Sequence, residues 1–309
     1  TMTSSSPKDD TPKSCCPTNI KPALNDYRGV GQRVSLRKDY GLDATLLDYD
    51  MYVTGTSTTS KHVILLAYDI FGWTCKVEQV ADRLAHDAGC LVVVPDFFRG
   101  DPWPITNIPV TQAGAFPQGV EPGEGLEVLY GWIMQHPNLI TNRISEITAI
   151  KQYFVQNYGI TKFGMTGFCW GGKVAFVAAA ATTRNGAPLL DAVATCHGAL
   201  LEKEDIEAVV RMGTVPICLL DSKDEPELHR TVFQPLILEA NNNKDTKKGD
   251  DATKTTQNVY KYFETMHHGW MGTRGTESVT DFEKEEVQQR WQEAMSDLVA
   301  FFTQAFAAK

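Results

Sequence analysis

"GFCWGGK", residues 167–173, places a cysteine among three glycines. The preceding stretch "FGMT" (163–166) has the character of a strand, and the following "GGKVAFVAAAATT" (171–183) has the alanine-rich composition of a helix. Gly167, Cys169 and Gly171 fit the G-x-C-x-G pattern of a nucleophile elbow, in which small residues permit a sharp strand-to-helix turn. This pattern predicts that Cys169 is a nucleophile at a helix N-terminus, where the helix dipole favours a thiolate. The alternative is a core cysteine beside packing glycines.

Continuous apolar runs alternate with stretches of helical period on both sides of this turn. The runs cover residues 62–69, 89–96, 163–168, 190–196 and 215–221, and the helical stretches include 75–89, 145–159 and 281–306. Strands that are apolar throughout are typical of parallel sheets buried on both faces. The sequence therefore predicts an α/β fold: one doubly wound, mostly parallel sheet with helices on both faces.

Three segments depart from this rhythm. Residues 1–25 are polar and rich in Ser, Pro, Lys and Asp, so we expect a flexible N-terminal segment ahead of a single domain over 26–309. Residues 101–140 are rich in Pro and Gly and form a candidate lid. Residues 241–256 are almost wholly polar and are expected to form a flexible loop.

Composition excludes several classes of function. The chain has 309 residues and a net charge of −9, and its pI of about 5.3 argues against binding to nucleic acid or to a membrane surface. No apolar run approaches the roughly 20 residues needed to span a bilayer, and from the polar residues at the start of the sequence we expect no secretion signal. The seven cysteines are irregularly spaced without a CxxC motif, which favours a reducing, cytoplasmic location and no zinc site. We expect no metal or organic cofactor, and a monomer or homodimer.

A nucleophile needs a base and an acid that orients the base, at later strand ends. "VPICLLDSKDEPEL" runs from a strand into Asp221 and Asp224, and "NVYKYFETMHHGW" runs from another strand into His267 and His268. The order cysteine, acid, histidine is that of the α/β-hydrolase fold. Three suitable residue types at three strand ends favour a catalytic triad over chance.

The sequence resembles the dienelactone hydrolase family of α/β-hydrolases from about residue 45 to the C-terminus. The resemblance rests on "YDIFG" (68–72), "PDFFRG" (95–100), "GFCWGG" (167–172), "LLDSKDE" (219–225) and "HHGW" (267–270). It implies a Cys-Asp-His triad that hydrolyses lactones or small esters through an acyl-enzyme.

Carried onto this chain, the resemblance makes Cys169 the nucleophile and His268, which precedes the Gly-Trp pair, the base, with His267 as the alternative. The acid of the family lies three residues after a glycine. Since Asp221 occupies that glycine position here, Asp224 is the expected acid and Asp221 remains a rival. We expect the oxyanion to be bound by the backbone amides of Ile70 and Trp170.

Other residues are candidates for substrate binding. Asp69 stands where the family carries a glutamate that holds the resting thiol, and it either plays that part or caps the following turn. Arg99 lies close to the position of a family arginine that binds a substrate carboxylate, and Arg274 is a second candidate. His197 ends a strand and is expected to face the pocket.

Aromatic residues are frequent in the loops around the predicted site. We expect about half of them to line a flat apolar pocket suited to a small unsaturated lactone. They are Phe71, Trp73, Phe98, Trp103, Trp170 and Trp270.

The sequence thus predicts a cysteine hydrolase acting on a small, anionic lactone or ester. The alternatives are a thioesterase or carboxylesterase for larger substrates and a catalytically silent binding protein with the same fold. A thiol redox protein, in which Cys15 or Cys16 would resolve an oxidised Cys169, leaves the acid and histidine without a purpose.

Overall fold

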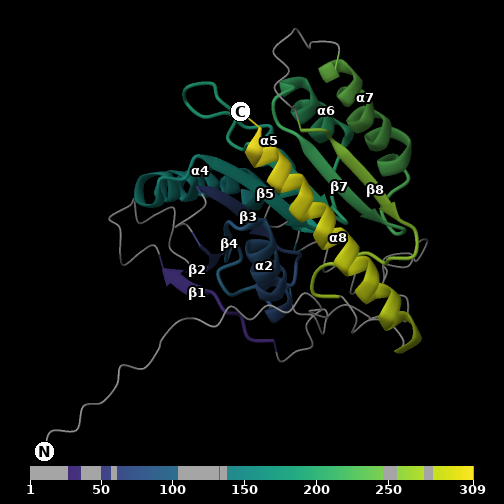
Figure 1. The fold of residues 1–309 in the computed structure, drawn as a ribbon, viewed down its shortest axis with the longest axis horizontal. Helices are drawn as coiled ribbons and strands as arrows, with labels where there is room; N and C mark the ends of the chain where they lie inside the picture. Colours follow the sequence, from purple (N-terminus) through teal and green to yellow (C-terminus); the bar gives the residue numbers. More distant parts are fainter. Residues whose placement is uncertain are drawn as a thin grey trace, which may run out of the picture.

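The computed structural model describes residues 27–35, 50–56, 61–103, 132, 138–245, 256–274 and 281–308. A central twisted sheet crosses the molecule, and helices cover both of its faces (Figure 1). The expected flexible N-terminal segment, and Cys15 and Cys16 within it, lie outside the described residues.

The described residues form an eight-stranded sheet in the order β1-β2-β4-β3-β5-β6-β7-β8. Its strands are β1 (Gln32–Ser35), β2 (Asp50–Gly55), β3 (His62–Ala67), β4 (Leu91–Pro95), β5 (Lys162–Phe168), β6 (Ala192–Cys196), β7 (Ile217–Ser222) and β8 (Val259–Phe263). The six neighbouring strands β4, β3, β5, β6, β7 and β8 pair in parallel, whereas β2 runs antiparallel to both β1 and β4. The mostly parallel α/β sheet predicted from the apolar runs is confirmed. Strands β4 and β6 are buried along their whole length, as strands covered on both faces must be.

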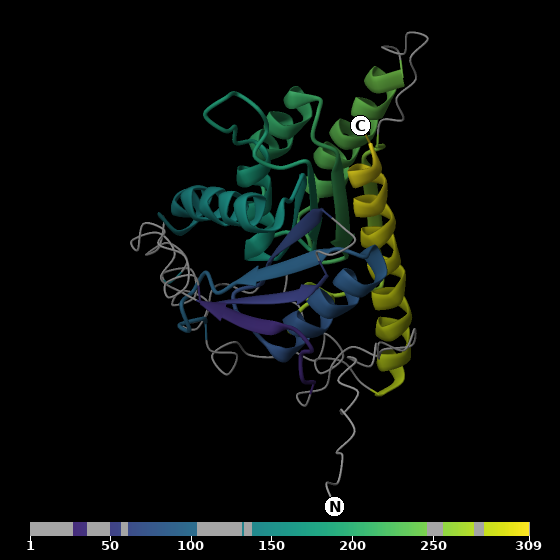
Figure 2. The same ribbon diagram turned by 60° about the vertical axis from the view of Figure 1, so that its left-hand side comes forward.

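The helices divide between the two faces of the sheet. They are α2 (Cys75–Ala88), α4 (Asn138–Tyr158), α5 (Trp170–Ala179), α6 (Lys203–Met212), α7 (Gln234–Asp245) and α8 (Asp281–Ala307), with a π-helical turn, η2 (His229–Phe233), leading into α7. Helix α8 packs with α2 on one face and reaches β6 and β7, while α4, α5, α6 and α7 pack in sequence on the other. Figure 2 shows α8 running along the side of the sheet away from α4 and α6.

The register of the sheet brings several strand ends to one edge. Phe168 pairs with Cys196, Cys196 pairs with Leu220, and Ser222 pairs with Phe263. The loops that follow β5, β6, β7 and β8 therefore leave the sheet side by side. In open parallel sheets this carboxyl edge is where ligand sites form.

Two expected irregular segments begin or end differently from the prediction. Residues 138–140 of the candidate lid belong to α4, and residues 241–245 of the expected loop belong to α7. Two hydrogen bonds between the side chain of Asn241 and the backbone of Asn258 stabilise this part of α7. The remainder of both segments lies largely outside the described residues, with Trp132 and residues 101–103 and 256 as exceptions.

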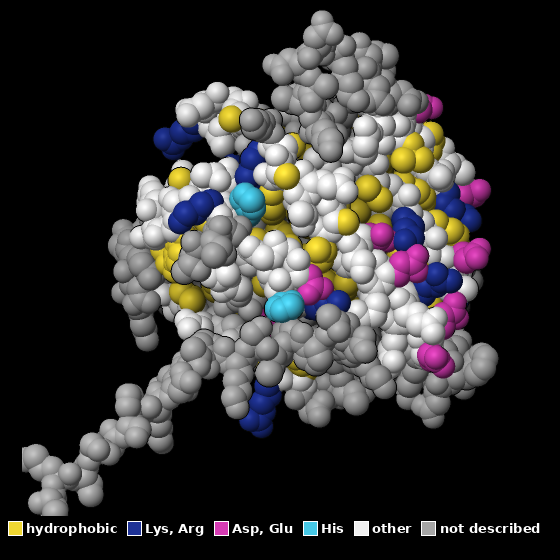
Figure 3. Space-filling model, viewed as in Figure 1, with side chains coloured by type: hydrophobic (Ala, Val, Ile, Leu, Met, Phe, Trp, Pro, Cys, Tyr) yellow, Lys and Arg dark blue, Asp and Glu magenta, His cyan; other side chains and the backbone are white. Residues whose placement is uncertain are grey.

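The described surface carries both signs of charge. On the face in Figure 3, acidic and basic side chains lie interspersed along one side, with hydrophobic side chains in small groups between them. Among the helices the structure describes, none has the length and apolar character to cross a membrane.

Candidate active site

Cys169 lies between β5 and α5 in a backbone conformation that non-glycine residues rarely adopt. Its φ is 53° and its ψ is −116°, a strained combination of the kind that functional sites retain. The neighbouring glycines are required by close backbone approaches. A Cβ atom on Gly167 would lie 2.0 Å from the carbonyl oxygen of Gly171, and one on Gly171 would lie 2.3 Å from that of Ala67. The glycine pattern in the sequence thus builds a tight elbow, with Cys169 at its apex and 8% exposed.

His268 connects Cys169 to a carboxylate. His268 lines the same pocket as Cys169, and its Nδ1 lies 2.7 Å from Oε1 of Glu225. The Glu225 side chain is 2% exposed and that of His268 is 12% exposed. The backbone amide of Ser222 donates to the other carboxylate oxygen of Glu225, which fixes this acid against the end of β7.

The neighbouring charges shift the pKa values of His268 and Glu225 in opposite directions. Burial alone would lower the pKa of His268, but the negative charge of Cys169, their hydrogen bond and Glu225 raise it to about 10. Burial would likewise raise the pKa of Glu225, but its hydrogen bond to His268 and the positive charge there lower it to about 2. An imidazolium beside a carboxylate is the arrangement that both shifts describe.

Asp224, the expected acid, does not contact the His268 ring. Its Oδ2 accepts a hydrogen bond from the backbone amide of His268 at 2.9 Å, so it holds the loop rather than the imidazole. The rival Asp221 is paired with His229 instead, with Oδ1 and Nδ1 3.1 Å apart. The contact expected for Asp224 therefore belongs to Glu225 in the structure.

Glu225 was missed because three acids crowd into "LLDSKDE" and only the shape of the turn decides which one reaches the histidine. A signal was present in the sequence. Ser222 and Glu225 form the S-x-x-E pattern in which the glutamate side chain folds back to the amide of the serine. That pattern directs Glu225 toward the strand end, and Asp224 lies one position short of it.

His267, the alternative base, turns away from Cys169. Its Nε2 lies 3.3 Å from the carbonyl oxygen of Arg274. Burial lowers the pKa of His267 to about 4, so the ring is neutral near pH 7 and fixes the loop.

The two amides expected to bind the oxyanion have fixed orientations. The carbonyl oxygen of Cys169 accepts hydrogen bonds from the amides of Gly172 and Ala199, both at 2.9 Å. The carbonyl oxygen of Asp69 accepts one from Gly72 at 3.0 Å. Because a trans peptide places its C=O and N–H on opposite sides, these bonds also set the directions of the next N–H groups, those of Trp170 and Ile70.

A pocket opens beside the elbow. It is lined by Asp69, Ile70, Phe71, Cys169, His268, Gly269 and Arg274. Its walls come from two loops, one after β3 and one after β8. Of the residues expected to bind substrate, Asp69, Phe71 and Arg274 lie at this pocket.

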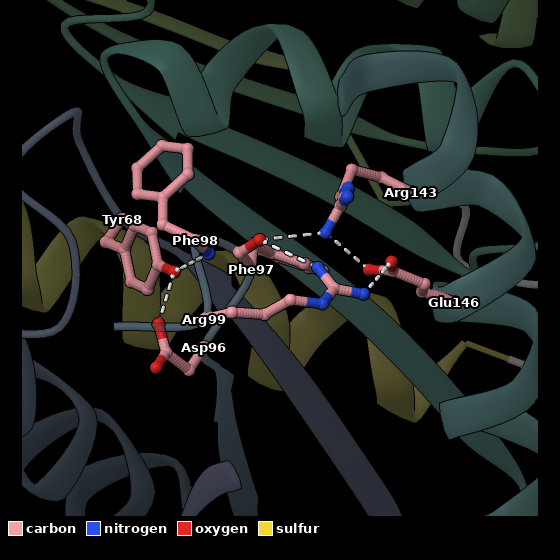
Figure 4. Close-up of polar contacts among 7 residues, drawn as sticks. All are labelled: Tyr68, Asp96, Phe97, Phe98, Arg99, Arg143 and Glu146. Carbon is pink, nitrogen blue, oxygen red and sulfur yellow. Dashed lines mark hydrogen bonds and ion pairs between the residues drawn. The ribbon is translucent and has the colours of Figure 1, made fainter. Parts of the chain in front are cut away.

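Arg99 lies away from the pocket lining. Its left-handed backbone (φ 54°) accompanies a side chain directed toward α4, as Figure 4 shows. There its Nη2 lies 2.8 Å from Oε1 of Glu146, and Nη1 donates to the carbonyl oxygen of Phe97 at 3.1 Å. Glu146 also binds the buried Arg143. The expectation that Arg99 faces the substrate is therefore not what the structure shows.

Tyr68 links the turn after β4 to the elbow. Its hydroxyl donates to Asp96 at 3.1 Å and accepts from the amide of Phe98 at 2.8 Å. Its ring stacks against Trp170, with centroids 6.4 Å apart. Its carbonyl oxygen accepts from the amide of Gly171. The aromatic side chains near the elbow thus support the backbone.

Most of the aromatic residues expected at the pocket are packed elsewhere. Trp270 is fully buried against Phe263, at a centroid distance of 4.8 Å. Trp103 packs edge-on against Trp132. Phe71 alone of the six predicted aromatics lines the described pocket.

His197 lies beside His268 rather than in the pocket lining. It is fully buried, and its ring centroid is 5.1 Å from that of His268. Burial and the positive charge of His268 hold the pKa of His197 well below its usual range. His197 is therefore a neutral ring packed against the base.

Within the described residues, no cluster of three or more His, Cys, Asp or Glu side chains could hold a metal ion. A thiol at a strained elbow, a histidine at the same pocket and a buried acid bonded to that histidine can perform nucleophilic acyl transfer.

The sheet, the elbow and the order of these residues define the α/β-hydrolase fold. The model of the dienelactone hydrolase family matches residues 50–306. The chain belongs to this family, as the sequence motifs indicated.

The chain is also similar to individual proteins. The chain is 28% identical over 296 residues to an uncharacterised AIM2 family protein of Schizosaccharomyces pombe, covering 94% of this chain and 98% of that protein. It is 30% identical over 193 residues to a carboxymethylenebutenolidase homologue of Rattus norvegicus, covering 62% and 64% of the two chains. Among solved structures, a protein from Klebsiella pneumoniae described as a dienelactone hydrolase superposes with a TM-score of 0.54 at 17% identity, over 86% of this chain and 98% of that one, and supports the fold.

Proposed function

We propose that this protein hydrolyses small lactones or esters through a thioester acyl-enzyme formed on Cys169. The observation that carries the proposal is that Cys169 and His268 line one pocket while Glu225 lies 2.7 Å from Nδ1 of His268. Glu225 takes the part of the triad acid: it orients the imidazole and stabilises its protonated form.

The first half-reaction acylates the cysteine. The thiolate of Cys169 attacks the carbonyl carbon, a C–S bond forms, and the carbonyl π electrons move to oxygen. The N–H groups of Ile70 and Trp170 receive this oxyanion. Because Glu225 occupies Nδ1 of His268, Nε2 is the nitrogen that serves the substrate. When the C–O bond breaks, Nε2–H protonates the leaving alkoxide, which stays attached as a hydroxyl group if the substrate is a lactone.

The second half-reaction restores the thiolate. Neutral His268 removes a proton from water, and the resulting hydroxide attacks the thioester carbon. Collapse of the new oxyanion breaks the C–S bond and releases the carboxylic acid. Cys169 leaves as a thiolate beside the imidazolium form of His268, so the enzyme regains its starting charges.

The pocket favours a small substrate that carries a negative charge. Ile70 and Phe71 offer apolar surface, and the positively charged Arg274, only 6% exposed, is among the lining residues. A buried cation recognises a carboxylate well because water does not screen the pair. Similarity to a carboxymethylenebutenolidase homologue agrees with a carboxylate-bearing lactone as the substrate class.

The deciding experiment compares turnover of a dienelactone and of p-nitrophenyl acetate by the wild type, Cys169→Ala and Cys196→Ala. Cys196 is a matched control because it is fully buried at the end of the neighbouring strand, outside the pocket lining. We expect Cys169→Ala and alkylation by iodoacetamide to abolish both activities, while Cys196→Ala stays close to the wild type. Full activity of Cys169→Ala would refute the proposal. Turnover of the acetate alone would keep the mechanism and assign a different ester.

Arg274→Gln tests the charge of the substrate. It should raise KM for the anionic dienelactone roughly tenfold or more while changing KM for the neutral acetate little, because removing a cation that faces a carboxylate weakens only that contact. Equal changes for the two substrates would remove Arg274 from substrate recognition.

A further inference from the structure

We infer that Thr273 is a positioning residue: through Asp69 it fastens the loop that carries the Ile70 amide to the loop that carries His268. We call residues 69–72 the oxyanion loop and residues 267–274 the histidine loop. The inference rests on the proposed function, since it assigns Thr273 a part in the same reaction. Thr273 is not among the residues that line the described pocket.

Every polar group of Thr273 is used between elements distant in sequence. Its amide donates to Oδ2 of Asp69 at 3.1 Å, and its hydroxyl donates to Oδ1 at 3.3 Å. The same hydroxyl lies 3.2 Å from that of Thr74. Its carbonyl oxygen accepts from Nζ of the buried Lys76 at 3.1 Å. Thr273 itself is 5% exposed, so water does not compete for these bonds.

Asp69 accepts hydrogen bonds both from Thr273 and from within the oxyanion loop. Its Oδ1 accepts from the amide of Phe71 at 3.0 Å, and its carbonyl oxygen closes the turn to Gly72. The carboxylate is 2% exposed and therefore depends on its donors. A Cβ atom on Gly272 would lie only 2.8 Å from Oδ2 of Asp69, so glycine permits the close approach of the two loops.

The contact between the two loops sets how the Ile70 amide and the His268 ring are placed around the substrate carbonyl carbon. The oxyanion loop supplies Ile70 and Phe71 to one wall of the pocket, and the histidine loop supplies His268 and Arg274 to the other. In the transition state the Ile70 amide and the His268 ring must both face the reacting centre. Misplacement by about 1 Å can reduce a rate by on the order of 100-fold. The Asp69–Thr273 contact is the direct bond between these two walls.

The test replaces Thr273 by Val, which keeps its shape and removes the hydroxyl, and by Ser, which keeps the hydroxyl. Thr148→Val is the matched control, because the Thr148 hydroxyl bonds only within helix α4, to the carbonyl oxygen of Ile144. We expect Thr273→Val to lower kcat for p-nitrophenyl acetate about tenfold with KM little changed, because the oxyanion contact acts in the transition state. Thr273→Ser should restore most of this loss, and Thr148→Val should behave as the wild type.

A second readout separates positioning from general damage. Alkylation of Cys169 by iodoacetamide requires the thiolate but no oxyanion site, so its rate should stay within about twofold of the wild type in Thr273→Val. A kcat that does not change, or an alkylation rate that falls as far as kcat, would overturn the inference.

Hydrogen exchange keeps the inference testable apart from hydrolysis. Amides of residues 70–72 should exchange about tenfold faster in Thr273→Val than in the wild type or Thr148→Val. If the proposed hydrolysis failed but this exchange rose, the loop contact would stand without its catalytic purpose. Unchanged exchange would overturn the inference whatever the activity.

Discussion

Two histidine–carboxylate pairs lie at the end of strand β7, and they differ in what surrounds them. Glu225 and His268 stand 2.7 Å apart, with a thiol on the far side of the imidazole. Asp221 and His229 stand 3.1 Å apart with both side chains 1% exposed. The first pair reaches the pocket through His268, and the second is enclosed beneath η2.

The electrostatic consequences run in opposite directions. Burial raises the pKa of Glu225, but its contacts with His268 outweigh burial and lower that pKa to about 2. Burial leaves the pKa of Asp221 raised to about 6, although His229 acts to lower it. The same two chemical groups thus give a carboxyl that ionises more easily than usual in one place and one that ionises less easily than usual in the other. A histidine–carboxylate pair can serve catalysis only if it also has a nucleophile beside it and a pocket that admits the substrate.

The largest expected effect separates the two carboxylates by activity. Glu225→Gln should lower kcat/KM for p-nitrophenyl acetate by roughly 1,000-fold or more, because loss of a triad acid misorients the base and leaves the imidazolium unstabilised. Asp221→Asn should lower it less than about tenfold, since that acid has no contact with the base. Steady-state kinetics near pH 7 measures both.

Asp224→Asn provides the control for the acid assignment. Asp224 accepts from the His268 amide, so its variant should lose activity only several-fold through the loop. A loss in Asp224→Asn as large as that in Glu225→Gln would mean that Asp224 reaches the ring during catalysis.

The next effect separates the pairs by stability. His229→Ala should reduce the free energy of unfolding by about 3 kcal/mol, because it leaves Asp221 buried without its partner. It should keep much of the wild-type activity below the unfolding transition. Urea denaturation measures the change, and kinetics at low urea checks the activity. Little destabilisation with a large loss of kcat would place this pair in the reaction.

The sequence was enough to predict His268 of the first pair but not its partner Glu225. The parallel sheet could be predicted because buried strands must be apolar along their whole length. The elbow could be predicted because Gly167 and Gly171 flank the cysteine at the spacing that a sharp strand-to-helix turn requires. Which acid reaches His268 depends on how one short turn aims two adjacent side chains, and the S-x-x-E pattern of Ser222 and Glu225 was the one local signal for it. Glu225 was passed over for Asp224.

Arg99 failed as a prediction for a similar reason. The family resemblance placed Arg99 close to an arginine that binds a substrate carboxylate, but a left-handed backbone and the buried acceptor Glu146 on α4 direct its side chain elsewhere. Glu146 lies 47 residues away in sequence. Long-range partners of this kind follow from tertiary packing, whereas apolar periodicity is local.

A smaller effect tests whether only the first pair acts on a thiol. At pH 6, His268→Ala should slow alkylation of Cys169 by iodoacetamide about 10- to 100-fold, because the imidazolium that favours the thiolate is gone. His229→Ala should leave the rate unchanged. Mass spectrometry of the modified peptide follows the reaction. Equal slowing by both variants would indicate that the two pairs are coupled.

The smallest effect concerns the pH dependence of stability. An aspartate in the unfolded chain has a pKa near 3.9, and that of Asp221 in the folded protein is about 6. Between about pH 4 and pH 6 the folded protein therefore binds a proton that the unfolded chain has released, so this group makes the free energy of unfolding fall as the pH rises. Replacing Asp221 by Asn should remove on the order of 2 kcal/mol of that fall.

The first pair contributes little in the same window. The lowered pKa of Glu225 gives stability that is present above about pH 4.5 and is lost as the pH falls toward 2. The raised pKa of His268 gives stability that is complete below about pH 6.5 and is lost as the pH rises toward 10. Urea titrations of the wild type and Asp221→Asn at pH 4 and pH 6 therefore isolate Asp221. Parallel pH dependences for the two proteins would mean that Asp221 stays ionised throughout this range.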